Sequence, residues 1–208
     1  MNESTQSEKL RRAIFIDRDG TLNEEVGYIR NLAEFKLFDF AAEAVRLVNE
    51  AGWLVIVVTN QSGIARGLFS EEFLAQVHVE MQAELERSGA RVDGIYFCPH
   101  HPTTGDAPYR ISCDCRKPQP GLLLRAAEDF ELDLSLCAVI GDRLRDVQTA
   151  QTVGARSVLV LTGYGQEELY GTTSGKGIAT GGQAPDHVGT NLLEAVRWVI
   201  NEFNLKSS

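Results

Sequence analysis

The fold is decided by the stretch AIFIDRDGT at residues 13–21, in which four apolar residues run directly into a polar turn. A short apolar run with polar flanks is typical of a buried strand. The pattern returns twice: WLVIVV at 53–58 leads into Thr59 and Asn60, and LCAVI at 136–140 leads into Gly141 and Asp142. We therefore expect several buried strands that end in polar side chains.

Segments with the apolar spacing of one helix face lie between these strands. The spacing predicts helices over 41–50, 71–89, 121–130, 144–153 and 191–203, with Ser70 as the cap of the second. Further strands are expected over 94–97, 157–161 and around 186–188. Apolar strands that alternate with amphipathic helices specify a parallel sheet covered on both faces. The sequence therefore predicts an α/β fold with a Rossmann-like, doubly wound parallel sheet.

The chain is expected to form a flexible N-terminal tail over 1–12 and one domain over 13–208. Two stretches interrupt the alternation of strands and helices. The segment 98–115 is rich in Cys, His and Pro, whereas the segment 163–185 is rich in Gly and Thr and is expected to be a mobile surface loop.

Composition narrows the class of protein. The longest apolar run, 53–58, is far shorter than the roughly 18 residues of a membrane span, and the polar N-terminus lacks the apolar core of a secretory signal, so we expect a cytoplasmic protein. A net charge of −9 without a basic block disfavours nucleic-acid binding. The negative charge of an anionic ligand would therefore have to be neutralised at the binding site by a metal and a few basic residues.

Carboxylates at two strand ends are the main candidates for chemistry. Asp17 and Asp19 follow one strand and Asp142 follows another, so they could share a hard divalent cation such as Mg²⁺. Thr59, Asn60 and Lys117 could stabilise phosphate oxygens at the same edge. Taken singly, each has an ordinary structural reading, such as a solvated turn, a surface lysine or a helix cap. Their coincidence at converging strand ends favours a site.

Cysteine spacing predicts a second metal centre. A CxH pair and a CxC pair are suited to tetrahedral Zn²⁺, with the ligands Cys98, His100, Cys113 and Cys115. Four protein ligands leave no open position, which favours a structural site that stiffens the loop. His101 competes with His100, but adjacent residues rarely both reach one ion, so we expect His101 at the surface or facing substrate. Cys137 is interpreted as a core residue.

The motif Asp17 to Thr21, the pair Thr59 and Asn60, Lys117, and Gly141-Asp142 with Asp146 together resemble the four motifs of the haloacid dehalogenase-like phosphohydrolases, over roughly 13–161. The resemblance implies phosphoryl transfer to Asp17, with Asp19 as acid and base. It also implies Mg²⁺ held by the Asp17 carboxylate, the Asp19 backbone carbonyl and Asp142, charge stabilisation by Thr59 and Lys117, and a supporting role for Asp146.

The zinc loop and the extended motifs at 17–23, 59–67 and 113–118 are similar to the histidinol-phosphatase-related branch of that family. No insertion can hold the separate cap domain of larger members, so the resemblance implies an open site for a small sugar phosphate, and a monomer is expected. Glu25 and Val26 replace the Asp and His of the pattern. The residues expected to recognise substrate are Glu25, Val26, Gly27, Tyr28, Thr59, Asn60, Gln61, Ser62, Arg116 and Lys117.

The guanidinium of Arg116 could bind a second, remote phosphate, which favours a sugar bisphosphate as substrate. Arg143, beside Asp142, is a weaker candidate. Two other enzymatic readings are a histidinol-phosphate phosphatase and a broader sugar-phosphate phosphatase. A different class is a non-catalytic module that binds a phosphorylated ligand. The presence of every catalytic residue of the motifs argues against that module.

Overall fold

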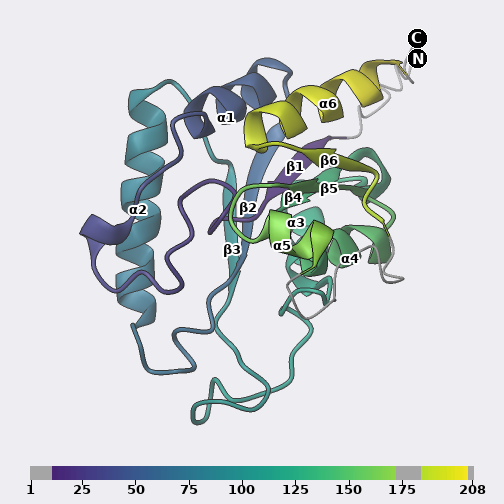
Figure 1. Ribbon diagram of the computed structural model, residues 1–208. Coiled ribbons are helices and arrows are strands. Elements are labelled where there is room, and N and C mark those ends of the chain that lie inside the picture. Colours follow the sequence, from purple (N-terminus) through teal and green to yellow (C-terminus); the bar gives the residue numbers. More distant parts are fainter. Residues whose placement is uncertain (1–10, 172–183, 206–208) are drawn as a thin grey trace, which may run out of the picture.

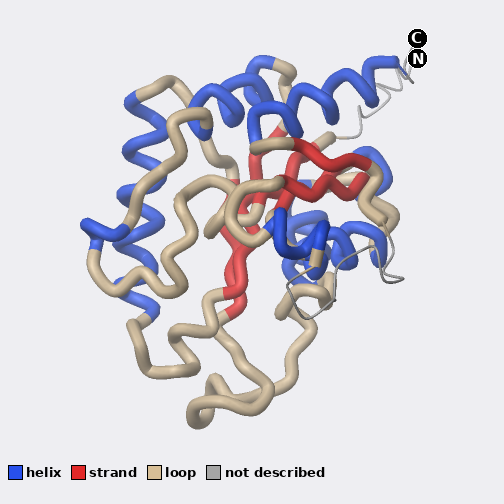
Figure 2. Tube along the Cα trace, in the orientation of Figure 1, coloured by secondary structure: helices blue, strands red, loops and turns tan. Residues whose placement is uncertain are grey.

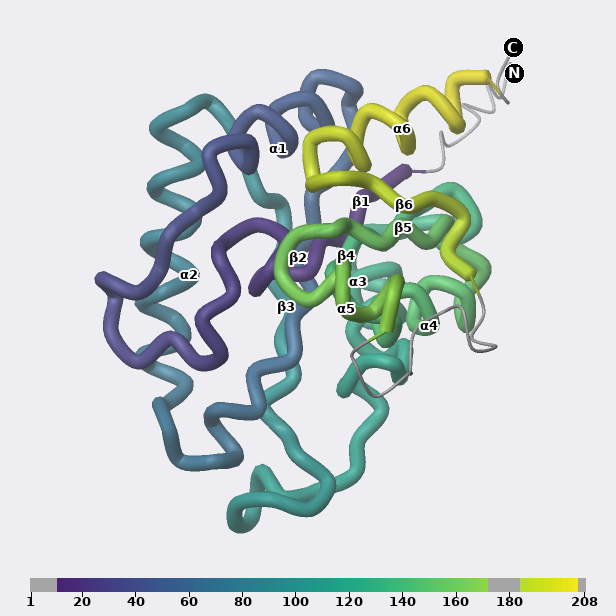
Figure 3. The backbone as a smooth tube through the Cα atoms, viewed as in Figure 1, coloured from purple at the N-terminus to yellow at the C-terminus, as the bar shows by residue number. Residues whose placement is uncertain are grey.

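The computed structural model describes residues 11–171 and 184–205. Six parallel strands form one sheet in the order β3-β2-β1-β4-β5-β6, with β1 at its centre (Figures 1 and 3). This is the strand order of Rossmann-type sheets, so the predicted doubly wound architecture is confirmed. The strands are β1 Ala13–Ile16, β2 Leu54–Asn60, β3 Gly94–Cys98, β4 Ala138–Gly141, β5 Arg156–Val160 and β6 His187–Gly189.

Helices cover both faces of the sheet (Figure 1). The helices are α1 Ala41–Glu50, α2 Glu71–Arg87, α3 Gly121–Phe130, α4 Leu144–Thr152, α5 Gly165–Tyr170 and α6 Leu192–Leu205. The core on one side includes residues of α1, α2 and α6, and the core on the other includes residues of α3 and α4. Two layers of helices therefore enclose a sheet that is buried on both faces.

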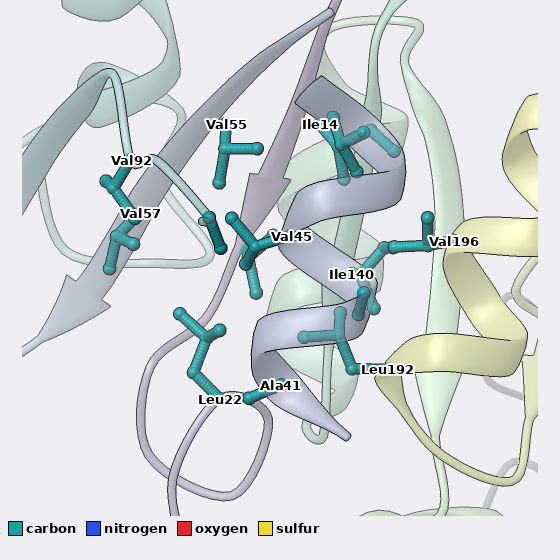
Figure 4. Packing of buried hydrophobic residues seen from close by; sticks show 14 of the residues in the cluster. Ile14, Leu22, Ala41, Val45, Val55, Val57, Val92, Ile140, Leu192 and Val196 are labelled. Atoms are coloured by element: carbon teal, nitrogen blue, oxygen red, sulfur yellow. The ribbon is translucent and has the colours of Figure 1, made fainter. Parts of the chain in front are cut away.

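The strand side chains alternate between these two cores, as the period of a strand requires. In β1, Ile14 belongs to the core of α1 and α6, whereas Phe15 belongs to the core of α3. Figure 4 shows Val45 of α1 beside the sheet residue Val55, and Val196 of α6 near Ile140. Each fully buried aliphatic side chain of this kind contributes about 1.5–3 kcal/mol relative to exposure.

Most predicted elements are confirmed, including the Ser70 cap, whose hydroxyl accepts a hydrogen bond from the Phe73 N–H at 3.2 Å. The predicted strand start at Leu136 is wrong, because 134–136 form a 3₁₀ turn capped by Asp133. Cys137 lies just before β4 rather than in it, and it is a buried core residue as expected.

The structure describes only parts of the two segments that are predicted to be flexible. Arg11, expected in a free tail, donates to the backbone carbonyl of Phe130 at 3.3 Å, while residues 1–10 lie outside the described part. A loop throughout 163–185 is wrong at Gly165–Tyr170, which forms α5. The Arg143–Glu168 ion pair joins this helix to the start of α4. The centre of the Gly-rich segment, 172–183, lies outside the described residues.

After β3, residues 98–115 form a long loop that extends from the carboxyl end of the sheet (Figure 2). Ligands of such sheets bind at this end, beyond the carboxyl ends of the strands. Among the residues that the structure describes, no helix has both the length and the apolarity that a membrane span needs.

Candidate active site

Three buried carboxylates meet where β1 and β4 lie side by side. The Asp17 N–H donates to the Ile140 carbonyl at 2.9 Å, which continues the pairing of the two strands past their ends. One carboxylate oxygen from each of Asp17, Asp142 and Asp146 lies within 4.8 Å of the others. The chain leaves these adjacent strands in opposite directions, which opens a crevice at this point of the sheet. The predicted convergence of the strand ends is confirmed.

Lys117 lies at the centre of this acidic cluster, although it comes from a distant loop. Its Nζ is 3.0 Å from Asp17 Oδ1 and 2.6 Å from Asp146 Oδ1, and it donates to the Val58 carbonyl at 2.8 Å. Burial alone would lower the pKa of Lys117, yet Asp146 and Asp17 raise it above its ordinary value. The lysine therefore stays charged beside Asp17.

Close backbone packing encloses the carboxylate of Asp142. A Cβ on Gly20, whose φ is +80°, would lie 2.3 Å from Asp142 Oδ2, and one on Gly163 would lie 2.2 Å from the same atom. Only glycine leaves room for the carboxylate at these two positions. The Tyr164 N–H donates to Asp142 Oδ2 at 2.8 Å.

The acidic cluster carries more negative charge than Lys117 neutralises. Burial, together with repulsion from Asp17 and Asp146, raises the pKa of Asp142 to about 8. Burial also raises the pKa of Asp17, although Lys117 opposes this shift. A hard divalent cation bound by oxygen ligands would offset the excess negative charge, so these residues fit such an ion. Asp146 is bound to Lys117, and its supporting role stays a prediction.

Asp19 is held by a network of donors. Arg18 Nη2 lies 2.8 Å from both carboxylate oxygens, Asn23 Nδ2 donates to Oδ1 at 3.1 Å, and Gln61 Nε2 donates to Oδ2 at 2.7 Å. Burial alone would raise the pKa of Asp19, yet the Arg18 charge and these hydrogen bonds hold it below its ordinary value. In the free protein, Asp19 is therefore a carboxylate whose position is defined by its partners.

The end of β2 contributes two side chains with different tasks. Thr59 is buried, and its hydroxyl accepts a hydrogen bond from Gln61 Nε2 at 2.9 Å. Asn60, expected to donate to phosphate, lines the pocket and also exchanges two hydrogen bonds of 3.1 Å with the backbone of Lys117. The amide of Asn60 thus joins β2 to the segment that carries the lysine.

A pocket of about 300 Å³ opens above these groups. Its walls are Asp17, Asp19, Glu25, Gly27, Tyr28, Thr59, Asn60, Ser62, Arg66, Arg116, Arg143, Arg145 and Tyr164. Most residues predicted to recognise substrate are therefore brought together. Gln61 and Lys117 are buried behind the lining. Val26 does not line the pocket, because the turn in which Gly27 N–H donates to the Glu25 carboxylate leaves its side chain 48% exposed.

Sequence reasoning missed three residues of the lining, namely Arg66, Arg145 and Tyr164. Arg145 lies one residue before Asp146 at the start of α4, and a basic residue next to this acidic motif is a signal for an anion-binding role. Tyr164 follows β5 and lies beneath Arg143, whose Cζ is 3.2 Å from the ring centroid. Arg66 carried no signal beyond its place in the long 59–67 motif.

The predicted zinc ligands also meet, at the base of the 98–115 loop. The Sγ of Cys113 is 3.6 Å from that of Cys98 and 3.2 Å from that of Cys115, and His100 Nδ1 is 3.3 Å from Cys115 Sγ. Tetrahedral zinc with bonds of about 2.3 Å to sulfur requires edges of roughly 3.8 Å, so the four side chains fit this ion. His101 points elsewhere and contacts Arg66, which agrees with the choice of His100.

Comparisons with known proteins agree with this geometry. A model of the haloacid dehalogenase-like hydrolases matches residues 6–154, more than half of the chain. The D-glycero-beta-D-manno-heptose-1,7-bisphosphate 7-phosphatase of Photorhabdus laumondii is 45% identical over 73% of this chain and 81% of its own. The D-glycero-D-manno-heptose-1,7-bisphosphate 7-phosphatase of Thermosynechococcus vestitus is 39% identical over 91% of this chain and 95% of its own.

Solved structures extend the likeness. The D,D-heptose 1,7-bisphosphate phosphatase of B. bronchiseptica, determined with magnesium and phosphate, has a TM-score of 0.78 and 32% identity over 92% of this chain and 99% of its own. The match therefore spans the fold as well as the motifs. The chain belongs to the haloacid dehalogenase-like hydrolase family.

Proposed function

We propose that the chain is a Mg²⁺-dependent phosphatase that removes the 7-phosphate of D-glycero-D-manno-heptose 1,7-bisphosphate. The observation that carries the proposal is a buried, lysine-bound aspartate at the floor of a pocket lined by four arginines. Similar relatives bear the name of this activity over 80% or more of their length. The product would serve the biosynthesis of an ADP- or GDP-activated heptose.

The carboxylates of Asp17 and Asp142 and the backbone carbonyl of Asp19 would hold the Mg²⁺. When bound, the ion offsets the repulsion between Asp17 and the incoming phosphate and stabilises the charge on its oxygens. Lys117 contributes a fixed positive charge to the same region. The four zinc ligands would have no direct part in the reaction, because they form a closed structural centre.

In the first step, a carboxylate oxygen of Asp17 attacks the phosphorus, and the bond from phosphorus to the sugar oxygen breaks. Oδ1 is bound by Lys117, whereas Oδ2 accepts no hydrogen bond from the described residues and is free to attack. Asp19 gives a proton to the departing sugar oxygen. The negative charge of the bound phosphate raises the pKa of Asp19 and so favours the protonated form that this step needs.

In the second step, Asp19 takes a proton from water, which attacks the aspartyl-phosphate. The bond from phosphorus to the Asp17 oxygen breaks, inorganic phosphate leaves, and the Asp17 carboxylate is restored. The hydrogen bonds that stabilise Asp19 as a carboxylate suit this half of the cycle. Thr59, buried beside the cluster, would donate to an oxygen of the phosphoryl group.

The test is Mg²⁺-dependent phosphate release from the α and β anomers of the heptose bisphosphate and from histidinol phosphate. We expect kcat/KM for one bisphosphate anomer to exceed that for histidinol phosphate by about 100-fold, since a hydrogen-bonded anion site discriminates by several kcal/mol. Asp17→Asn should abolish turnover. Equal values, or a preference for histidinol phosphate, would overturn the substrate, and no turnover of any ester would favour a binding module.

A further inference from the structure

The four arginines of the pocket differ in their partners. On the side of β4 and β5, Arg143 forms an ion pair with Glu168 at 3.3 Å, and the negative charges of Asp146 and Asp17 stabilise the charge of Arg145. On the side of β2 and β3, Arg66 and Arg116 pair with no carboxylate among the residues that the structure describes. The second pair is therefore the part of the pocket wall with uncompensated positive charge.

His101 lies beside this wall and contacts Arg66, one of its two arginines. Its Nδ1 accepts hydrogen bonds from the backbone N–H groups of Thr103 at 3.2 Å and Thr104 at 3.0 Å. A nitrogen that accepts carries no proton, so the neutral ring bears its hydrogen on Nε2. Nε2 lies 3.1 Å from Arg66 Nη2, and a guanidinium nitrogen can only donate. Two donors thus face each other, and no hydrogen bond from either of these two nitrogens to an acceptor is found among the described residues.

Backbone packing keeps these two donors together. Gly105, with a φ of +90°, lies so close to the loop after β2 that a Cβ on it would be 1.7 Å from the Ala65 carbonyl oxygen. The loop that carries His101 therefore rests directly on the residue before Arg66. Arg116 is tied to the same loop, because its Nη1 donates to the His100 carbonyl at 3.1 Å.

We propose that Arg66 and His101 form the binding site for the phosphate on carbon 1 of the substrate. A phosphate oxygen accepts from both donors at once and so resolves their conflict, and the guanidinium can offer a second, parallel hydrogen bond. The inference rests on the proposed function, because only a bisphosphate presents this distal group while its other phosphate reacts at Asp17.

The test compares heptose 1,7-bisphosphate with heptose 7-phosphate, which has the same reacting group. Arg66→Ala should lower kcat/KM for the bisphosphate by about 10- to 100-fold, as expected for a lost hydrogen bond to a charged group, and change that for the 7-phosphate far less. Inhibition by heptose 1-phosphate, which keeps only the distal phosphate, should weaken by a similar factor. The kcat/KM of Arg66→Lys for the bisphosphate should lie between those of the wild type and Arg66→Ala, since lysine keeps the positive charge but lacks the two parallel N–H donors of a guanidinium.

Two variants of His101 separate its donor from its acceptor. The amide N–H of His101→Gln can take the place of Nε2–H, whereas the shorter His101→Asn presents its amide near Nδ1 and can only support Thr103 and Thr104. We expect the glutamine variant to keep more of the bisphosphate preference than the asparagine variant. The matched control is Arg110→Ala, which removes an exposed arginine of the same loop outside the pocket lining.

The outcomes separate this inference from the proposed function. A wild-type protein with no preference for the bisphosphate over the 7-phosphate would overturn both. Two results would overturn the Arg66 and His101 site alone, provided that the wild type prefers the bisphosphate. In the first, Arg66→Ala lowers kcat/KM for both substrates by the same factor. In the second, Arg66→Ala leaves inhibition by heptose 1-phosphate unchanged. Melting temperatures of all variants identify any loss that comes from unfolding.

Discussion

His78 is buried behind the active site, and its stability contribution should depend on pH. It lies on α2, with Nε2 3.3 Å from Arg18 Nη1 and the ring 6.1 Å from that of Phe97. Burial first, and then the charge of Arg18, lowers the pKa of His78 to about 3, although Asp19 opposes the shift. The folded protein therefore holds this imidazole neutral at pH values where the unfolded chain binds a proton.

The sign and size of the effect follow from linkage. As pH falls below the unfolded pKa of 6.5, only the unfolded state takes up the proton, so the free energy of unfolding decreases until the pH reaches the folded pKa of about 3. Between pH 7 and pH 5 the proton uptake costs the native state about 2 kcal/mol. His78→Gln removes the titration while its amide oxygen can still accept from Arg18.

Urea unfolding of both proteins at pH 7 and pH 5 measures this difference. The wild type should lose about 2 kcal/mol more than His78→Gln between the two pH values, a comparison in which the other titrating groups cancel. His78→Leu should show the same reduced pH dependence, but lower stability at pH 7, because Arg18 loses its acceptor. If wild type and His78→Gln lose the same free energy, His78 titrates in the folded protein and the reasoning fails.

Three further changes probe the zinc loop and its neighbours. Cys113→Ser should lower the melting temperature and the zinc content together, and an unchanged zinc stoichiometry would contradict the structural centre. Asn60→Ala should lower kcat more than it raises KM and destabilise the protein by about 1–3 kcal/mol, because the backbone of Lys117 loses two partners; calorimetry and kinetics check both effects. Arg116→Ala should raise KM for a bisphosphate more than for a monophosphate, and equal increases would remove its assigned role.

The backbone framework of the site could be predicted because it depends on apolar and polar patterns that are visible in the sequence. Apolar runs locate β1, β2 and β4, and a parallel sheet brings their carboxyl ends to one edge, so Asp17 and Asp142 had to approach each other. The same reasoning failed for α5, because Gly165 reads as a loop residue. Its close packing on the Val160 carbonyl, where a Cβ would lie 1.7 Å away, depends on tertiary structure.

Side-chain partners could not be predicted in this way. Asn60 lies at the expected strand end, yet which atoms its amide meets depends on how a loop that begins 38 residues later returns to β2. Arg66 shows the same limit, because its contact His101 is 35 residues distant in sequence. Spacing along the chain carries no information about such contacts, since long loops are held by packing rather than by a periodic pattern.

The proposed zinc centre lies close to three parts of the active site. Cys115 is two residues from Lys117, the carbonyl of the proposed zinc ligand His100 accepts from Arg116, and His101, next to that ligand, contacts Arg66. A bound metal would add to the contacts of Asn60 and Gly105 that already hold these positions, and would fix the loop more closely than those contacts alone. Loss of the metal should therefore reduce turnover through Lys117 and bisphosphate affinity through Arg66 and Arg116, although no zinc ligand lines the pocket.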